Sequence, residues 1–239
     1  MKRHGFAWSA GLTLVASLST FSTGPATAAE AGPKLFYGVE LDASYDLVER
    51  GKSFSWHSLV WAGTDTHKVL LKSEGEHDRE RLDEAELHAY YSRMISQFWD
   101  VYGGVRYDFK PVGTTFGAVG IKGLLPYRFE VDLTGFVSHR GRLSARLEVS
   151  REILITQRLV ADPYVSLDLA AQNEYRRDVA AGLTELETGI KLRYDVTREF
   201  APFVEFRYRR NLGYTSVLVR RDGEAPESVG FRVGIRLRF

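Results

Sequence analysis

The sequence predicts an all-β protein, a transmembrane antiparallel up-and-down β-barrel of about 12 strands. Three observations predict this fold. Apolar and polar residues alternate along nearly all of the chain after residue 35, which places them on opposite faces of strands. The alternating segments are roughly ten residues long, the length with which a tilted strand crosses a bilayer. The connections between the segments are alternately long and short, as extracellular loops and periplasmic turns are in outer-membrane barrels.

The first residues read as an export signal. A basic start, residues 1–4, is followed by a mostly apolar run over residues 6–21 and by small residues at Ala26 and Ala28 that fit a signal peptidase site. An N-terminal membrane anchor is the alternative, but the apolar run is short and is interrupted by Ser and Thr. We therefore expect a signal peptide over residues 1–28, a short periplasmic segment over 29–35 and the barrel over 36–239.

The first and last strands show the alternation most clearly. In residues 36–48, apolar side chains occupy the odd positions from Tyr37 to Leu47. In residues 229–239 they occupy the odd positions from Val229 to Phe239, and Gly or Arg occupies the even positions between them. The terminal Phe239 resembles the assembly signal of outer-membrane barrels. Ten further strands are expected at residues 53–63, 67–76, 84–95, 98–109, 116–124, 128–138, 143–155, 159–171, 183–196 and 201–210.

The alternation does not by itself say which face is inside. A secreted β-sandwich or a lipocalin-type barrel would place the apolar face inside. Two features favour the membrane barrel: the polar face carries both signs of charge densely, and the chain ends on an aromatic residue in the apolar phase. We therefore expect the protein in the outer membrane of a Gram-negative cell, in contact with lipid and lipopolysaccharide.

Composition narrows the function. The chain has no Cys, which excludes a disulfide scaffold and a thiolate zinc site. Its 32 Lys and Arg nearly balance its 31 Asp and Glu. The basic excess typical of nucleic-acid-binding proteins is therefore missing, and we expect no nucleic-acid partner.

Eight stretches in order along the chain resemble one protein family. They are residues 68–76 (KVLLKSEGE), 91–93 (YSR), 98–100 (FWD), 103–109 (GGVRYDF), 123–130 (GLLPYRFE), 154–159 (LITQRL), 182–189 (GLTELETG) and 198–203 (REFAPF). On these residues the chain resembles the copper resistance protein B family over about residues 59–239. The resemblance implies an outer-membrane protein of copper tolerance and copper homeostasis, which binds copper or limits its entry, and periplasmic copper-handling proteins as partners. Members often carry a Met- and His-rich segment before the barrel, whereas residues 29–35 contain neither residue.

The polar face of the predicted strands offers metal ligands. His57 and His88 fall on it by strand parity, and imidazole is a good ligand for Cu(II), to which carboxylates add charge. The strands involved are neighbours in the sequence, so these side chains are expected to converge. The predicted metal site consists of His57, His88, Glu74, Glu84 and Glu86, with Met94 available for Cu(I); copper is the only cofactor expected.

Other interpretations remain open. His88 and the glutamates can instead pair with Lys72, Arg93 or Arg106 as ordinary polar filling of the lumen. A narrow outer-membrane channel or a structural barrel without copper binding is the alternative function. An outer-membrane lipid hydrolase is the third, because Ser55 and His57 share a face. A catalytic triad also needs an orienting group and an oxyanion donor, and the sequence shows neither, so we expect no enzyme.

Overall fold

The computed structural model describes residues 34–47, 53–78, 81–110, 112–174, 177, 179–221, 223 and 225–239. The expected signal peptide, residues 1–28, and the segment 29–33 lie outside the described residues. The part of the chain from Pro33 to Phe239 forms one compact unit. Among the described residues no helix has the length and apolar character needed to cross a membrane.

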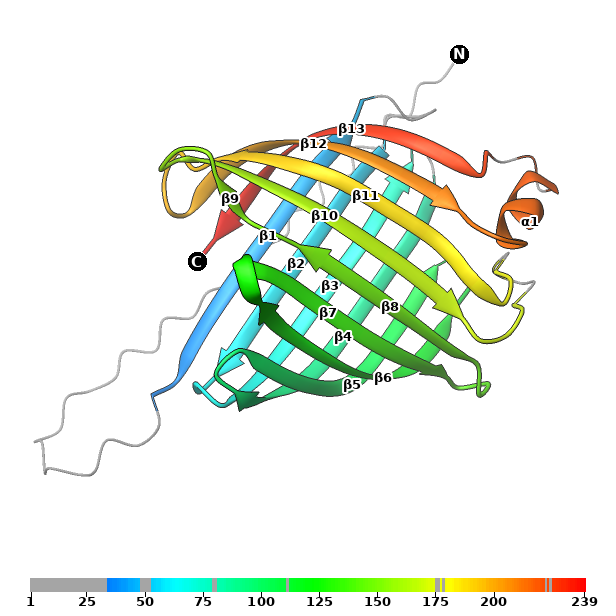
Figure 1. Ribbon diagram of the computed structural model, residues 1–239, viewed down its shortest axis with the longest axis horizontal. Helices are drawn as coiled ribbons and strands as arrows, with labels where there is room; N and C mark the ends of the chain where they lie inside the picture. Colours follow the sequence, from blue (N-terminus) through cyan, green and yellow to red (C-terminus); the bar gives the residue numbers. More distant parts are fainter. Residues whose placement is uncertain are drawn as a thin grey trace, which may run out of the picture. The chain divides into compact units, whose positions relative to one another are not determined.

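Antiparallel strands build this unit almost completely (Figure 1). They are β1 (Phe36–Asp46), β2 (Ser53–Gly63), β3 (His67–Asp78), β4 (Arg81–Ser96), β5 (Trp99–Lys110), β6 (Thr114–Leu125), β7 (Phe129–Ser138), β8 (Leu143–Ser150), β9 (Ile153–Leu154), β10 (Leu159–Ala170), β11 (Gly182–Tyr194), β12 (Phe200–Asn211) and β13 (Glu227–Arg238).

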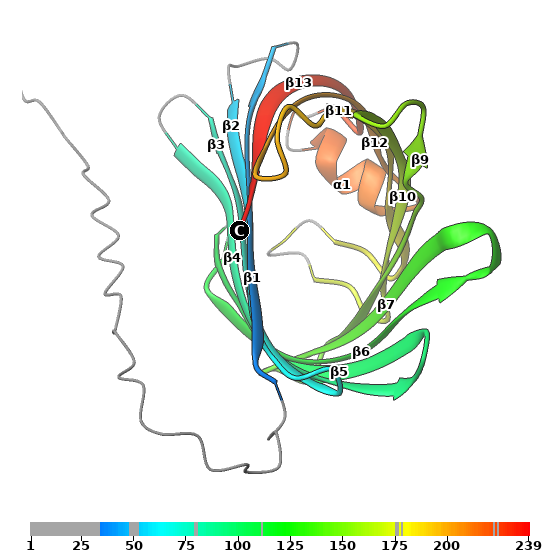
Figure 2. The same cartoon turned by 90° about the vertical axis from the view of Figure 1, so that its left-hand side faces the viewer.

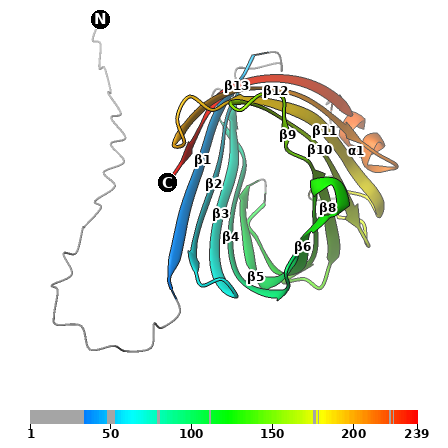
Figure 3. The ribbon, with the colours of Figure 1, turned by 60° about the vertical axis from the view of Figure 1, so that its left-hand side comes forward.

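The sheet closes on itself. Each long strand pairs with its neighbour in the sequence, β13 pairs with β1, and β10 pairs with β11. The two-residue β9 continues β8 after a short break, and both pair with β10. The prediction of a 12-stranded up-and-down barrel is therefore confirmed. Figure 3 shows β1 to β5 as one wall, with the later strands closing the ring.

Burial is inverted relative to a water-soluble protein. On β5, Val105 is 54% exposed whereas Arg106 is 6% and Asp108 0% exposed. The same holds around the barrel: large apolar side chains are exposed on the outer face, and most fully buried side chains are polar or charged. This pattern confirms that the apolar phase of the strands faces outward and the charged phase faces the lumen. A closed barrel satisfies its backbone hydrogen bonds internally, and this one presents apolar side chains on its outer surface.

The glycine-rich strand β6 gives room to an aromatic side chain in the lumen. A Cβ atom at Gly120 would collide with the ring of Tyr102 on β5. Because the ring lies flat over this glycine, the Tyr102 hydroxyl reaches Asp132 and Thr134 on β7. Glycine is therefore needed at position 120 to leave space for the Tyr102 ring, and not to allow an unusual backbone conformation.

Two long connections differ from the plain loops that the sequence predicts. The connection between β12 and β13 contains a short helix, α1 (Thr215–Arg221). The connection between β10 and β11 turns into the ring of strands, as Figure 2 shows. Its Arg177 Nη2 donates a hydrogen bond to Asp108 Oδ2 on β5 (2.7 Å), and Ala180 N donates one to Thr215 Oγ1 on α1 (2.9 Å). These tertiary contacts have no counterpart in the local sequence pattern.

The outward orientation predicts how the barrel responds to a charge on its lipid face. We expect Val105→Arg, near the middle of β5, to reduce the free energy of unfolding in lipid vesicles by about 2–4 kcal/mol, because a cation at the bilayer midplane loses hydration. Val69→Arg, equally exposed but at the third residue of β3, should cost roughly 0–1 kcal/mol because it lies near the interface. Urea unfolding of both variants measures the difference; equal effects would contradict the predicted depth of the two positions.

Candidate metal site in the barrel lumen

A row of ionisable side chains crosses six neighbouring strands on the lumen wall, with one side chain from each strand. The strand register places directly opposite one another Arg236 and Asp42, Asp42 and His57, His57 and Glu74, Glu74 and Glu86, and Glu86 and Asp108. Side chains directly opposite on paired strands lie close enough to interact. We call these six residues, from β13 through β1 to β5, the lumen row.

Three ligands converge on the β3–β4 part of the row. Glu74, Glu86 and His88 each offer one ligand atom, and these atoms lie within 4.8 Å of one another. His88 is 3% exposed, and its Nε2 lies 3.1 Å from Glu86 Oε2. Its Nδ1 lies 2.6 Å from the Tyr90 hydroxyl, which fixes the orientation of the ring.

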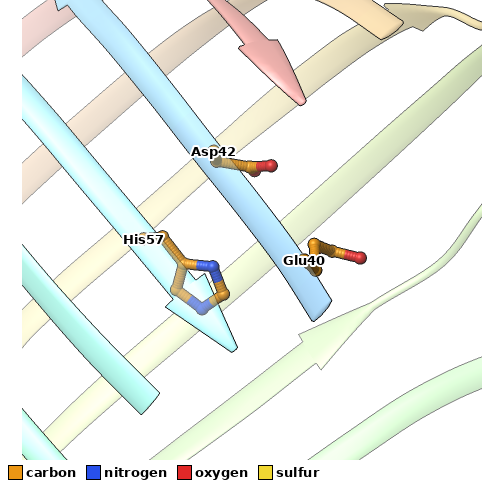
Figure 4. A group of neighbouring side chains, drawn as sticks. All are labelled: Glu40, Asp42 and His57. Carbon is orange, nitrogen blue, oxygen red and sulfur yellow. The ribbon is translucent and has the colours of Figure 1, made fainter. Parts of the chain in front are cut away.

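His57 extends this group toward β1. Its Nε2 lies 3.3 Å from Glu74 Oε1. His57 also forms a second group with Glu40 and Asp42, whose ligand atoms lie within 4.8 Å of one another. Figure 4 shows the two carboxylates on β1 and the imidazole on the neighbouring strand β2. One imidazole therefore connects two groups of carboxylates along the lumen wall.

Two of the predicted ligands lie apart from these groups. Glu84 lies opposite Glu76 and two residues before Glu86 on β4. Met94 is six residues from His88 along β4, about 20 Å at the rise of an extended strand. The structure thus brings together Glu74, Glu86 and His88, places His57 beside Glu74, and leaves Glu84 and Met94 elsewhere on β4.

Cations already neutralise the carboxylates of the row. Lys72 Nζ lies 2.7 Å from Glu74 Oε1, and Arg106 Nη2 lies 2.8 Å from Glu86 Oε1. The sequence-based alternative named these two cations, and the structure confirms both pairings. Arg93, the third cation named, is exposed at the far end of β4. A metal ion that enters the group must therefore compete with Lys72 and Arg106.

Asp108 ties this group to the inward-turning connection. Arg106 donates two hydrogen bonds to Asp108, from Nε (2.6 Å) and Nη2 (2.8 Å), and Arg177 donates a third (2.7 Å). Both guanidinium groups also lie over the Phe116 ring, at 5.0 Å and 5.4 Å from its centroid. A fully buried carboxylate with two cationic partners is well compensated, and the loss of its charge would leave both cations without a partner.

The donor set fits Cu(II). An imidazole nitrogen and two carboxylate oxygens suit this ion. A soft Cu(I) ion prefers sulfur ligands, and the only methionine of the described residues, Met94, is distant. A metal ion that replaces the His88–Glu86 hydrogen bond gains both groups as ligands. Tyr90 meanwhile continues to hold the other nitrogen of the ring.

Some residues of the site could not be identified from the pattern of the strands. Glu40 and Asp42 lie on the polar face of β1, but their approach to His57 depends on the register between β1 and β2. Arg177 comes from a connection without periodicity. The alternation identifies the face on which a side chain lies, and the register decides which side chains meet.

Comparisons with known proteins point to one family. The family model of copper resistance protein B precursor (CopB) matches residues 38–239. Copper resistance protein B of Escherichia coli is 38% identical over 188 residues, covering 78% of this chain and 64% of that protein. Copper resistance protein B homolog of Pseudomonas syringae pv. tomato is 35% identical over 190 residues, covering 79% of this chain and 65% of that protein. The chain thus spans less than two thirds of the length of either relative.

Solved structures share the fold. The NanC porin superposes with a TM-score of 0.57 at 14% identity, covering 83% of this chain and 98% of the porin. The KdgM porin superposes with a TM-score of 0.53 at 11% identity, covering 84% of this chain and 99% of the porin. At such low identity, the likeness concerns the barrel architecture alone.

The buried Asp108 predicts a large effect on stability. We expect Asp108→Asn to lower the free energy of unfolding by about 3–5 kcal/mol, because the buried Arg106 and the partly buried Arg177 lose their anionic partner. The matched control is Glu130→Gln: Glu130 pairs with Lys122 at 3.4 Å, and both side chains are about half exposed. The control should cost less than about 1 kcal/mol. Urea unfolding in vesicles compares the two, and similar losses would show that the Asp108 network contributes no more than a surface pair.

Proposed function

The chain belongs to the copper resistance protein B family, and we propose that it acts in copper tolerance by binding Cu(II) in its lumen at Glu74, Glu86, His88 and His57. The observation that carries the proposal is the convergence of His88 with two carboxylates, whose ligand atoms lie within 4.8 Å of one another. The nearby imidazole of His57 supplies a second nitrogen ligand.

The proposed location is the outer membrane. The exposed apolar outer face supports it, as does the likeness of the barrel to porins. In this location the outer face contacts lipid and lipopolysaccharide, and the ends of the lumen open toward the medium and the periplasm. Periplasmic copper-handling proteins are the proposed partners for copper held in the lumen.

The proposed role is to bind copper and limit its entry rather than to catalyse a reaction or conduct. Ion pairs join strands that are three positions apart in the sheet: Lys191 on β11 with Asp42 on β1 (3.1 Å), and Arg232 on β13 with Glu76 on β3 (2.9 Å). Together with Arg177 on Asp108, these pairs place charged side chains between distant strands of the lumen. We expect a lumen crossed in this way to hold ions at its wall and to leave little free path.

Copper titration tests the site through two changes of opposite sign. We expect His88→Gln to weaken Cu(II) binding by the refolded barrel at least tenfold, because a nitrogen ligand is lost. We expect Lys72→Met to strengthen it at least tenfold, because the cation 2.7 Å from Glu74 no longer repels the ion. Isothermal titration, with electron paramagnetic resonance to count nitrogen ligands, measures both effects.

His139→Gln is the control for this titration, because His139 lies in the exposed turn between β7 and β8. The affinity of the His139→Gln variant for Cu(II) should equal that of the unmodified protein. If all three variants bind Cu(II) as the unmodified protein does, copper binds outside the lumen row and the proposed site is wrong.

Conductance separates the proposed role from the channel alternative. In planar bilayers we expect the unmodified barrel to show no stable open level, because the charged side chains obstruct the lumen. The triple variant Arg177→Ala, Lys191→Ala, Arg232→Ala should show measurable steps, because three side chains that meet partners on distant strands are shortened. Stable open steps from the unmodified barrel would favour the channel function instead.

A further inference from the structure

A cavity of about 420 Å³ opens at the rim that carries the short turns. Its walls are the turn after β9, the turn between β11 and β12, and the end of β13. Two backbone hydrogen bonds connect these walls, from Asp195 N to Arg158 O (2.7 Å) and from Arg238 N to Glu199 O (3.0 Å). The cavity is therefore a constructed part of the barrel mouth, with the volume of a small-ligand site.

The lining of the cavity is basic. Four arginines line it, Arg158, Arg198, Arg236 and Arg238, against two carboxylates, Asp195 and Glu199. Asp195 is engaged by Arg193 outside the cavity lining (2.9 Å). Among the described residues, neither Arg158 nor Arg198 has an acidic partner within 4.0 Å. Two exposed guanidinium groups are therefore available to an anion.

The inner wall connects the cavity with the lumen row. Arg236 holds Asp42 through Nε (2.7 Å) and Nη2 (2.6 Å), and Arg238 Nε holds Glu40 (2.7 Å). An anion that accepts hydrogen bonds from Arg236 and Arg238 competes with these two carboxylates. Glu40, Asp42 and His57, whose ligand atoms lie within 4.8 Å of one another, are then released from both arginines, and Lys191 remains 3.1 Å from Asp42.

We propose that this cavity binds a small multivalent carboxylate and that the bound anion draws Arg236 and Arg238 away from Asp42 and Glu40, which then bind a copper ion that the anion carries. Arginine forks match carboxylates in two-point hydrogen bonds. The ligand class is therefore an anionic chelate of Cu(II) with a di- or tricarboxylate, with its free carboxylates on the arginines and its metal toward His57. Binding of the anion by the arginines, the anion step, does not depend on the proposed function. Binding of its copper ion by Glu40 and Asp42, the copper step, rests on the proposed function.

Citrate without metal tests the anion step. We expect the refolded full chain in nonionic detergent to bind citrate, and the double variant Arg158→Gln, Arg198→Gln to bind it at least tenfold more weakly by isothermal titration. The control is Arg140→Gln, Arg220→Gln, two exposed arginines in connections on the opposite rim, which should bind citrate unchanged. No binding by the unmodified barrel, or equal binding by the first double variant, would overturn the proposal.

Copper citrate tests the second step. The unmodified barrel should bind the copper chelate at least tenfold more tightly than citrate, and Glu40→Gln should bind the two equally because one metal ligand is lost. Glu40 lies outside the group formed by Glu74, Glu86 and His88, so free Cu(II) should still bind this variant. Equal affinities in the unmodified barrel would overturn the copper step, while free Cu(II) titration separately decides the proposed function.

Discussion

Pairing of opposite charges inside the closed sheet is the constraint on which this structure depends. With apolar side chains on the outer face, the other half of every strand points into a confined interior, where an isolated charge is costly. The four carboxylates of the lumen row, Asp42, Glu74, Glu86 and Asp108, are met by Arg236, Lys191, Lys72, Arg106 and Arg177. The interior is therefore a compensated network, and a ligand enters it only by exchange with an existing partner.

Exchange lets the same residues serve both the fold and the proposed copper binding. Glu74 and Glu86 stabilise the fold as partners of Lys72 and Arg106, and they are also the carboxylates nearest to His88. A divalent cation gains two carboxylates and an imidazole but must displace two side-chain cations. Its affinity is therefore set by the difference between two large electrostatic energies, which makes a single neighbouring charge such as Lys72 decisive.

The alternation of apolar and polar residues was sufficient to predict the strands, because a barrel strand needs only one apolar face and a length of about ten residues. It also predicted the face of each side chain, and hence that His57, His88, Glu74 and Glu86 share the lumen. It did not predict which of them meet, since that depends on the register between strands: Glu84 and Met94 have the correct parity but the wrong level. The helix α1 and the inward turn of Arg177 depend on contacts between distant segments, which periodicity does not encode.

The central claim is the proposal that copper binds in the lumen at Glu74, Glu86, His88 and His57, in exchange for the cations on these carboxylates. X-ray diffraction at the copper absorption edge, from crystals of the barrel soaked in Cu(II), tests it most directly. The account predicts an anomalous peak bonded to His88 Nε2 and to carboxylate oxygens of Glu74 and Glu86, with the Lys72 ammonium moved off Glu74. Copper peaks confined to other places, with Lys72 still on Glu74, would contradict it.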